Sequence, residues 1–177
     1  MVHRVLVAVD GSSASNAALE VACALADNYE AALALLTVAE PGEIDDDVIA
    51  AAQTEGLIPS DASFMSVFDA YSSSSIKTED RRVEQTAILA SIIAEQVVAT
   101  AKAYSRDKPF QAIKTFIESG YPAKAILECA EKNKADIIIM GHDQQGRIKS
   151  LVKGSVANHV QREATCPVLI YCQPAGD

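Results

Sequence analysis

The chain has 177 residues, of which 49% are apolar and 22% are charged. Its 24 acidic and 15 basic residues give a net charge of −9, which disfavours a general nucleic-acid binder and a protein that docks on an anionic membrane. A chain of this length and apolar content is expected to fold as one domain over residues 1–177 around a sizeable core.

The amino-terminal and cysteine patterns indicate the compartment. The apolar run Val5–Val9 is too short for a secretory signal, and no stretch approaches the ~20 apolar residues that span a bilayer. The four cysteines form no CxxC motif and the three histidines are scattered, so we expect free thiols and no metal site. These features predict a soluble cytoplasmic protein.

Short apolar runs alternate with amphipathic segments in the first half of the chain. Val2–Val9 and Ala32–Val38 are each predicted as a buried strand, because both are short and almost continuously apolar. The Ala-rich segment Ala14–Asn28 between them is predicted as a helix, with Ser12 as its N-cap. Residues 42–85 are interpreted as a long insertion after the second strand.

The same alternation continues in the second half. The predicted helices are Thr86–Ser105, Ala123–Asn133 and Val156–Arg162, and the predicted strands are Phe110–Ile117, Asp136–Met140 and Cys166–Cys172. Pro122 suits the first turn of the middle helix, where its missing N–H costs no hydrogen bond. Strands that alternate with helices predict an α/β fold, namely an open five-stranded parallel sheet with helices on both faces in a Rossmann-like three-layer α/β/α arrangement.

Ligands of such a sheet bind beyond the carboxyl ends of the strands, where the strand order reverses. Asp10, Val38 and Gly141 follow or end three predicted strands and are therefore expected near one another. Gly141, together with Gly154 and Ser155 at the start of the last helix, predicts a cradle of backbone N–H groups for an anion. Ordinary turn chemistry explains the same glycines, so the pattern alone does not establish a ligand.

Four sequence blocks, in this order and spacing, resemble the universal stress protein family of the adenine-nucleotide α-hydrolase-like group. They are VLVAVDGS (Val5–Ser12), DIIIMGH (Asp136–His142), GSVANHV (Gly154–Val160) and CPVLIY (Cys166–Tyr171). The resemblance implies a five-stranded parallel sheet and a homodimer formed through the last strand, Pro167–Cys172. In one branch of the family it also implies binding of ATP or AMP, with Mg²⁺ as a companion of ATP.

The resemblance further implies a nucleotide site. Its residues would be Ala8, Asp10, Val38 and Met140 at the base and ribose, and Gly141, Gly154, Ser155 and Val156 at the phosphates. Three residues depart from the binding pattern Gly-x2-Gly-x9-Gly-Ser/Thr and its surroundings. Gln144 replaces the middle glycine, Asp143 adds a negative charge, and Ala157 stands where a hydroxyl often meets phosphate.

Three functions remain open at this point. The first is a dimeric, adenine-nucleotide-responsive stress-response module that is not a fast enzyme and has no assigned catalytic residue. The second is a dimeric interaction protein or scaffold without a nucleotide, which the three departures favour. The third is a slow ATP hydrolase that uses the same site, where Asp10 is the one carboxylate visibly placed. Two other pairs do not predict catalysis: His142 beside Asp143 has no evident nucleophile, and Ser155 with His159 has no third, orienting group.

Overall fold

The computed structural model describes residues 1–39, 95, 98–99, 103, 113–142 and 155–172. The expected insertion at 42–85, most of the helix predicted for Thr86–Ser105 and the loop 143–153 lie outside these residues. The described elements are β1 (Arg4–Ala8), α1 (Ser13–Asn28), β2 (Ala32–Ala39), β3 (Ile113–Ser119), α5 (Pro122–Lys132), β4 (Ile137–His142), α6 (Ser155–Glu163) and β5 (Val168–Cys172).

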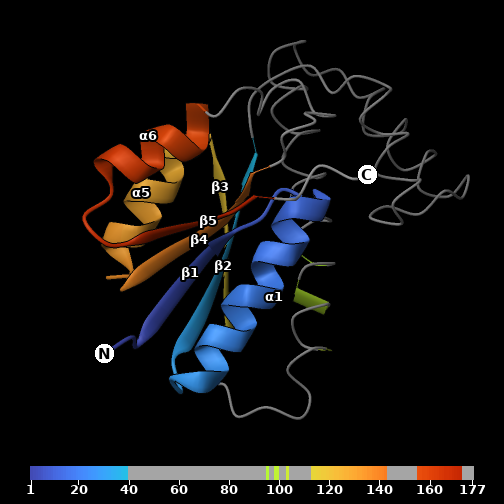
Figure 1. The fold of residues 1–177 in the computed structure, drawn as a ribbon. Coiled ribbons are helices and arrows are strands. Elements are labelled where there is room, and N and C mark those ends of the chain that lie inside the picture. The colour runs from blue at the N-terminus through green and yellow to red at the C-terminus, as the bar shows by residue number, and fades with distance from the viewer. Residues whose placement is uncertain (40–94, 96–97, 100–102, 104–112, 143–154, 173–177) are drawn as a thin grey trace, which may run out of the picture.

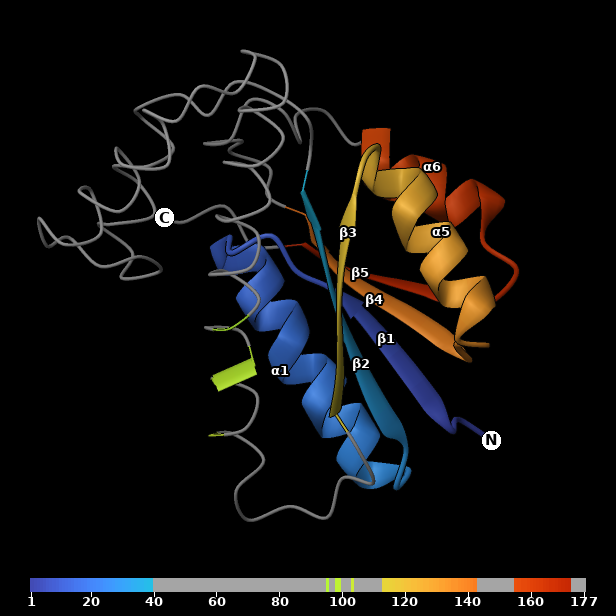
Figure 2. The same ribbon diagram turned by 180° about the vertical axis from the view of Figure 1, so that it is seen from behind.

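The five strands form one sheet in the order β3-β2-β1-β4-β5, and all four neighbouring pairs are parallel. Helix α1 covers one face of the sheet, and α5 and α6 lie together on the other face (Figures 1 and 2). The predicted parallel α/β architecture is therefore confirmed. The chain moves outward from β1 to β2 and β3 and then returns to β4 on the other side of β1, so the strand order reverses between β1 and β4.

The central strand β1 supplies side chains to two separate cores. Val5 and Val7 pack with α1, whereas Leu6 faces the opposite way and packs with α5 and α6. All three side chains are fully buried. This is the arrangement expected when a strand of a parallel sheet is covered on both faces, and it explains why the run reads as continuously apolar.

Two strands extend beyond their predicted ends. β3 continues to Ser119, because Ser119 pairs with Ala39 of β2. β4 continues to His142, because His142 pairs with Cys172 of β5. The sequence predicts that these two strands end at Ile117 and at Met140. Pairing with a neighbouring strand satisfies the backbone N–H and C=O groups of these residues, so the ladder overrides their local turn preference.

Asp136, just before β4, joins the start of β1 to the loop after α5. Its Oδ2 accepts hydrogen bonds from the backbone N–H groups of His3 (2.7 Å) and Arg4 (2.8 Å). The His3 bond is the main reason that the pKa of Asp136 lies below its ordinary value; partial burial opposes this effect, and the Arg4 bond adds to it. The ionised carboxylate thus stabilises the fold.

We expect Asp136→Asn to lower the free energy of unfolding by about 1 kcal/mol at pH 7, because exposure to water weakens the charge-assisted bonds. A depressed pKa contributes stability above the unfolded-state value, near ~4, and this contribution is lost as the pH falls through the folded value. Urea unfolding at pH 7 and in strong acid should therefore give a difference between wild type and variant that vanishes in acid. Glu131→Gln, at an exposed position on α5, is the matched control, and a difference that persists in acid would contradict the argument.

Candidate functional site

The carboxyl ends of β1, β2 and β4 lie side by side at the point where the strand order reverses. Ala8, the last residue of β1, is in register with Leu36 of β2 on one side and with Met140 of β4 on the other. The backbone N–H of Val9 continues the ladder by donating to the carbonyl oxygen of Leu36 at 2.9 Å. The residues that follow these three strand positions therefore share one edge of the sheet.

The turn from β1 into α1 is held by a local hydrogen-bond network. Asp10 Oδ1 accepts from the Ser12 N–H at 2.9 Å, and Ser12 Oγ caps the helix by accepting from the Ser15 N–H at 3.1 Å. Gly11 between them has a φ of 81°, a left-handed conformation that favours glycine. The predicted N-cap is confirmed, and one oxygen of Asp10 is engaged in forming the turn.

Gly141 is required by the packing of β4 against α1. A Cβ built at this position would lie 2.5 Å from the carbonyl oxygen of Ala14 and 2.5 Å from the backbone nitrogen of Ser15. The space beside Gly141 is thus filled by the first turn of α1. The structure shows the backbone of α1 in close approach to this glycine, and the role of Gly141 in binding a ligand stays a prediction.

Four of the eight predicted nucleotide-binding residues belong to the apolar core beneath α5 and α6. Met140 and Val156 are buried in this core, and Ala8 and Val38 are partly buried against it. Ala157 is also buried there, with 7% of its surface exposed, so its methyl group packs inside the protein. The structure therefore brings these predicted residues into one neighbourhood.

Helix α6 begins at Ser155 in the described part of the chain. The first N–H groups of a helix have no partner within the helix and favour an anion. Gly154, Gln144 and Asp143 lie outside the described residues, so their part of the predicted cradle stays a prediction. His159 of α6 makes an edge-to-face contact with Tyr121 at a ring-centroid distance of 6.3 Å, a contact that the sequence analysis missed.

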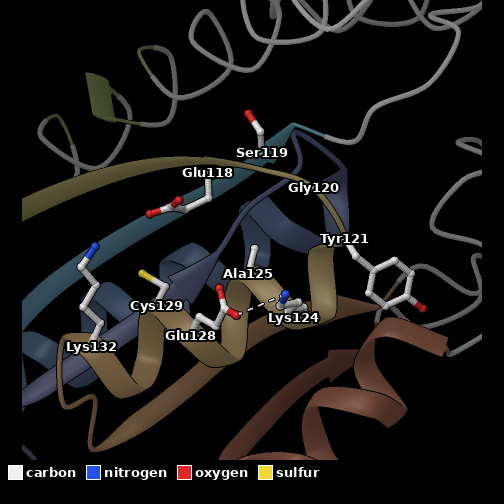
Figure 3. Close-up of a pocket in the computed structure, with 9 residues that line it drawn as sticks. All are labelled: Glu118, Ser119, Gly120, Tyr121, Lys124, Ala125, Glu128, Cys129 and Lys132. Carbon is white, nitrogen blue, oxygen red and sulfur yellow. Dashed lines mark ion pairs between the residues drawn. The ribbon is translucent and has the colours of Figure 1, made fainter.

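A cavity of about 230 Å³ lies elsewhere, between the end of β3 and one side of α5 (Figure 3). Its lining residues are Glu118, Ser119, Gly120, Tyr121, Lys124, Ala125, Glu128, Cys129 and Lys132, and it shares none with the predicted nucleotide site. The i, i+4 spacing of Lys124, Glu128 and Lys132 marks this side of α5 in the sequence. Nothing in the sequence places it beside β3, which is why the cavity was not predicted.

Cys129 at the base of this cavity is not an activated nucleophile. Burial raises the pKa of its thiol above the ordinary value, and the negative charge of Glu118 raises it further. The hydrogen bond that Asn133 Nδ2 donates to Cys129 Sγ, at 3.5 Å, acts in the opposite direction. The thiol is therefore protonated at neutral pH. None of the four cysteines takes part in a disulfide bond in the structure.

No helix in the described part of the chain is long and apolar enough to cross a membrane. Nor do the described residues contain a group of three or more His, Cys, Asp or Glu side chains that could hold a metal ion.

Comparison with known sequences gives consistent matches. The model of the universal stress protein family matches residues 1–171. Stress response protein NhaX of Bacillus subtilis is 31% identical over 94% of this chain and 96% of its own length. Universal stress protein YxiE of the same organism is 28% identical over 96% and 99%. A universal stress protein of Methanocaldococcus jannaschii is 44% identical over a shorter segment, 35% of this chain and 36% of that protein.

Solved structures share the fold. Universal stress protein UspA from Lactobacillus plantarum superimposes with a TM-score of 0.63 at 20% identity, over 96% of this chain and 97% of that one. A universal stress protein in complex with cAMP gives 0.59 at 23% identity, over 96% of each chain. The protein from Archaeoglobus fulgidus in complex with dAMP gives 0.56 at 18% identity, over 96% and 98%.

Proposed function

The chain belongs to the universal stress protein family, and from this premise we propose that it is a cytoplasmic, single-domain stress-response module that binds an adenine nucleotide, AMP or ATP. The observation that carries the proposal is the reversal of strand order between β1 and β4, which is where ligands of open α/β sheets bind. Two structural neighbours are complexes with the adenine nucleotides cAMP and dAMP, which agree with it in chemical class.

Within the proposed site, the base and ribose lie against the edge formed by Ala8, Asp10, Val38 and Met140. The phosphates approach the start of α6, with Gly141, Gly154, Ser155 and Val156 around them. Asp10 keeps Oδ2 for the nucleotide, because the turn hydrogen bond uses Oδ1. Where ATP is the ligand, Mg²⁺ would accompany its phosphates, and no residue of the chain is assigned to the metal. Binding then changes the surface that the protein presents to a partner, and no catalytic residue is assigned.

We also propose a homodimer through β5. Among the described strands, β5 lies at one edge of the sheet, and its side chains from Val168 to Tyr171 are partly exposed. An unpaired apolar edge promotes association, and pairing with its own copy across a two-fold axis removes it.

A second candidate is a family member that acts as an interaction scaffold without a nucleotide. Two observations favour it: the first turn of α1 fills the space beside Gly141, and Ala157 is buried. The two candidates differ in one measurable property, the response of the protein to adenine nucleotides.

Thermal unfolding with AMP or ATP tests the proposal. Nucleotide at a concentration of about 100 times its dissociation constant should stabilise the protein by about 2.7 kcal/mol. Asp10→Asn preserves the oxygen that accepts from Ser12 and removes the charge, so we expect an unchanged melting temperature without ligand and about fivefold weaker binding. Glu20→Gln, exposed on α1, is the control. No shift at millimolar nucleotide would leave the scaffold as the function.

A further inference from the structure

Among the described strands, β3 forms the edge of the sheet opposite β5. Among the described residues it pairs with β2 alone, so the backbone N–H and C=O groups along its outer side have no described partner. Ile117 in this strand has 45% of its surface exposed. Such an edge is a template for another strand.

The side chains of β3 alternate between two faces. Phe116 packs into the core beneath α5, so Lys114 and Glu118, two residues before and after it, lie on the same face. Figure 3 shows Glu118 on the side of the strand toward α5. One face of β3 therefore carries, in order along the strand, the cation of Lys114, the aromatic ring of Phe116 and the anion of Glu118.

This pattern is self-complementary. Two antiparallel copies of β3 related by a two-fold axis through Phe116 place Lys114 of each copy opposite Glu118 of the other. All seven residues, Ile113–Ser119, are then paired. Directly opposed side chains in an antiparallel pair have Cβ atoms ~5 Å apart, within reach of an ion pair. Both ion pairs form together, because the axis relates one to the other.

Other registers lose this match. A slip by two residues in one direction sets Lys114 opposite Phe116, and a slip in the other direction sets Glu118 opposite Phe116. In either case the charges lose their partners and the strand is no longer paired along its whole length. A slip by one residue places side chains from different faces of the two strands opposite each other, so Lys114 no longer faces Glu118.

We propose that β3 is a docking edge for a second copy of this chain, paired antiparallel about Phe116 and selected by the Lys114–Glu118 ion pairs. The interface is separate from the one proposed at β5, because the two strands lie at opposite edges of the sheet. A protein that uses both edges forms assemblies larger than a dimer. The inference does not depend on nucleotide binding.

Charge reversal tests the interface. Lys114→Glu sets two carboxylates against each other at both positions, and Glu118→Lys does the same with two ammonium groups. Each variant alone should raise the dissociation constant of this interface by about tenfold or more. An equimolar mixture of the two variants restores opposite charges at both positions, so it should associate as wild type does. The double variant Lys114→Glu with Glu118→Lys should also recover.

Sedimentation velocity across the micromolar range measures the mass of each sample, with Glu20→Lys on α1 as a control for the change in net charge. Circular dichroism shows whether each variant is folded. Each single variant should have a lower mass than wild type, at most half of it at concentrations where the wild-type β3 edges are paired. The equimolar mixture should return to the wild-type mass. Equal masses for wild type and both single variants, or a mixture that does not recover, would overturn the proposal.

Discussion

Gly141→Ala should lower the free energy of unfolding by about 3 kcal/mol, because overpacking against a rigid neighbour carries a cost of this size. The atoms that the new methyl group would meet belong to the backbone of Ala14 and Ser15. They cannot move aside as the end of a flexible side chain would, so the whole start of α1 has to shift. Urea unfolding without nucleotide measures the effect.

Ser119→Ala is a suitable control for this variant, because the residue is exposed near the same end of the sheet. Its expected change lies within about 0.5 kcal/mol. A Gly141→Ala protein as stable as wild type would show that α1 is free to shift away from β4. The measurement without nucleotide also separates two roles of Gly141. If Gly141 is needed for packing, the substitution lowers the stability of the ligand-free protein; if it is needed only for binding, that stability does not change.

Leu6→Ala should lower the free energy of unfolding by about 3–4 kcal/mol. Leu6 is fully buried at the centre of β1 and packs in the core beneath α5 and α6. Truncation removes its apolar contacts and leaves a space that a strand paired on both sides cannot close. The measurement is equilibrium unfolding in urea, followed by circular dichroism.

Tyr29→Ala is the contrasting variant, because 51% of the surface of Tyr29 is exposed. We expect it to change stability by less than about 1 kcal/mol although it removes a larger side chain. A loss at Leu6 no greater than the loss at Tyr29 would contradict the two-sided core described for β1.

The local elements were predictable because their signals lie within a few residues. Ser12 was expected to cap α1 and does so with its side-chain oxygen. Pro122 was expected in the first turn of α5 and is its first residue. The strand ends at Ser119 and His142 were not predictable, because they depend on how far a neighbouring strand extends.

The candidate site was predictable in part. The rule that ligands bind beyond the carboxyl ends of parallel strands directed attention to Ala8 and Met140, which the structure places in register. The space beside Gly141 belongs to α1, and no local pattern reveals this, because Ala14 and Gly141 are far apart along the chain. The cavity between β3 and α5 was missed for a related reason, since it needs the side of a helix and the end of a strand together.

By itself, the sequence determined the class of fold, the order of the described strands and helices along the chain and the N-cap of α1 at Ser12. These follow from the period of the apolar residues and from short-range hydrogen bonds. Only the tertiary structure decided which strands form the edges, what fills the space beside Gly141, and that Lys114 and Glu118 lie along a free edge among the described residues. The physical reason is that packing brings together residues from distant parts of the chain, and local propensities carry no record of those contacts.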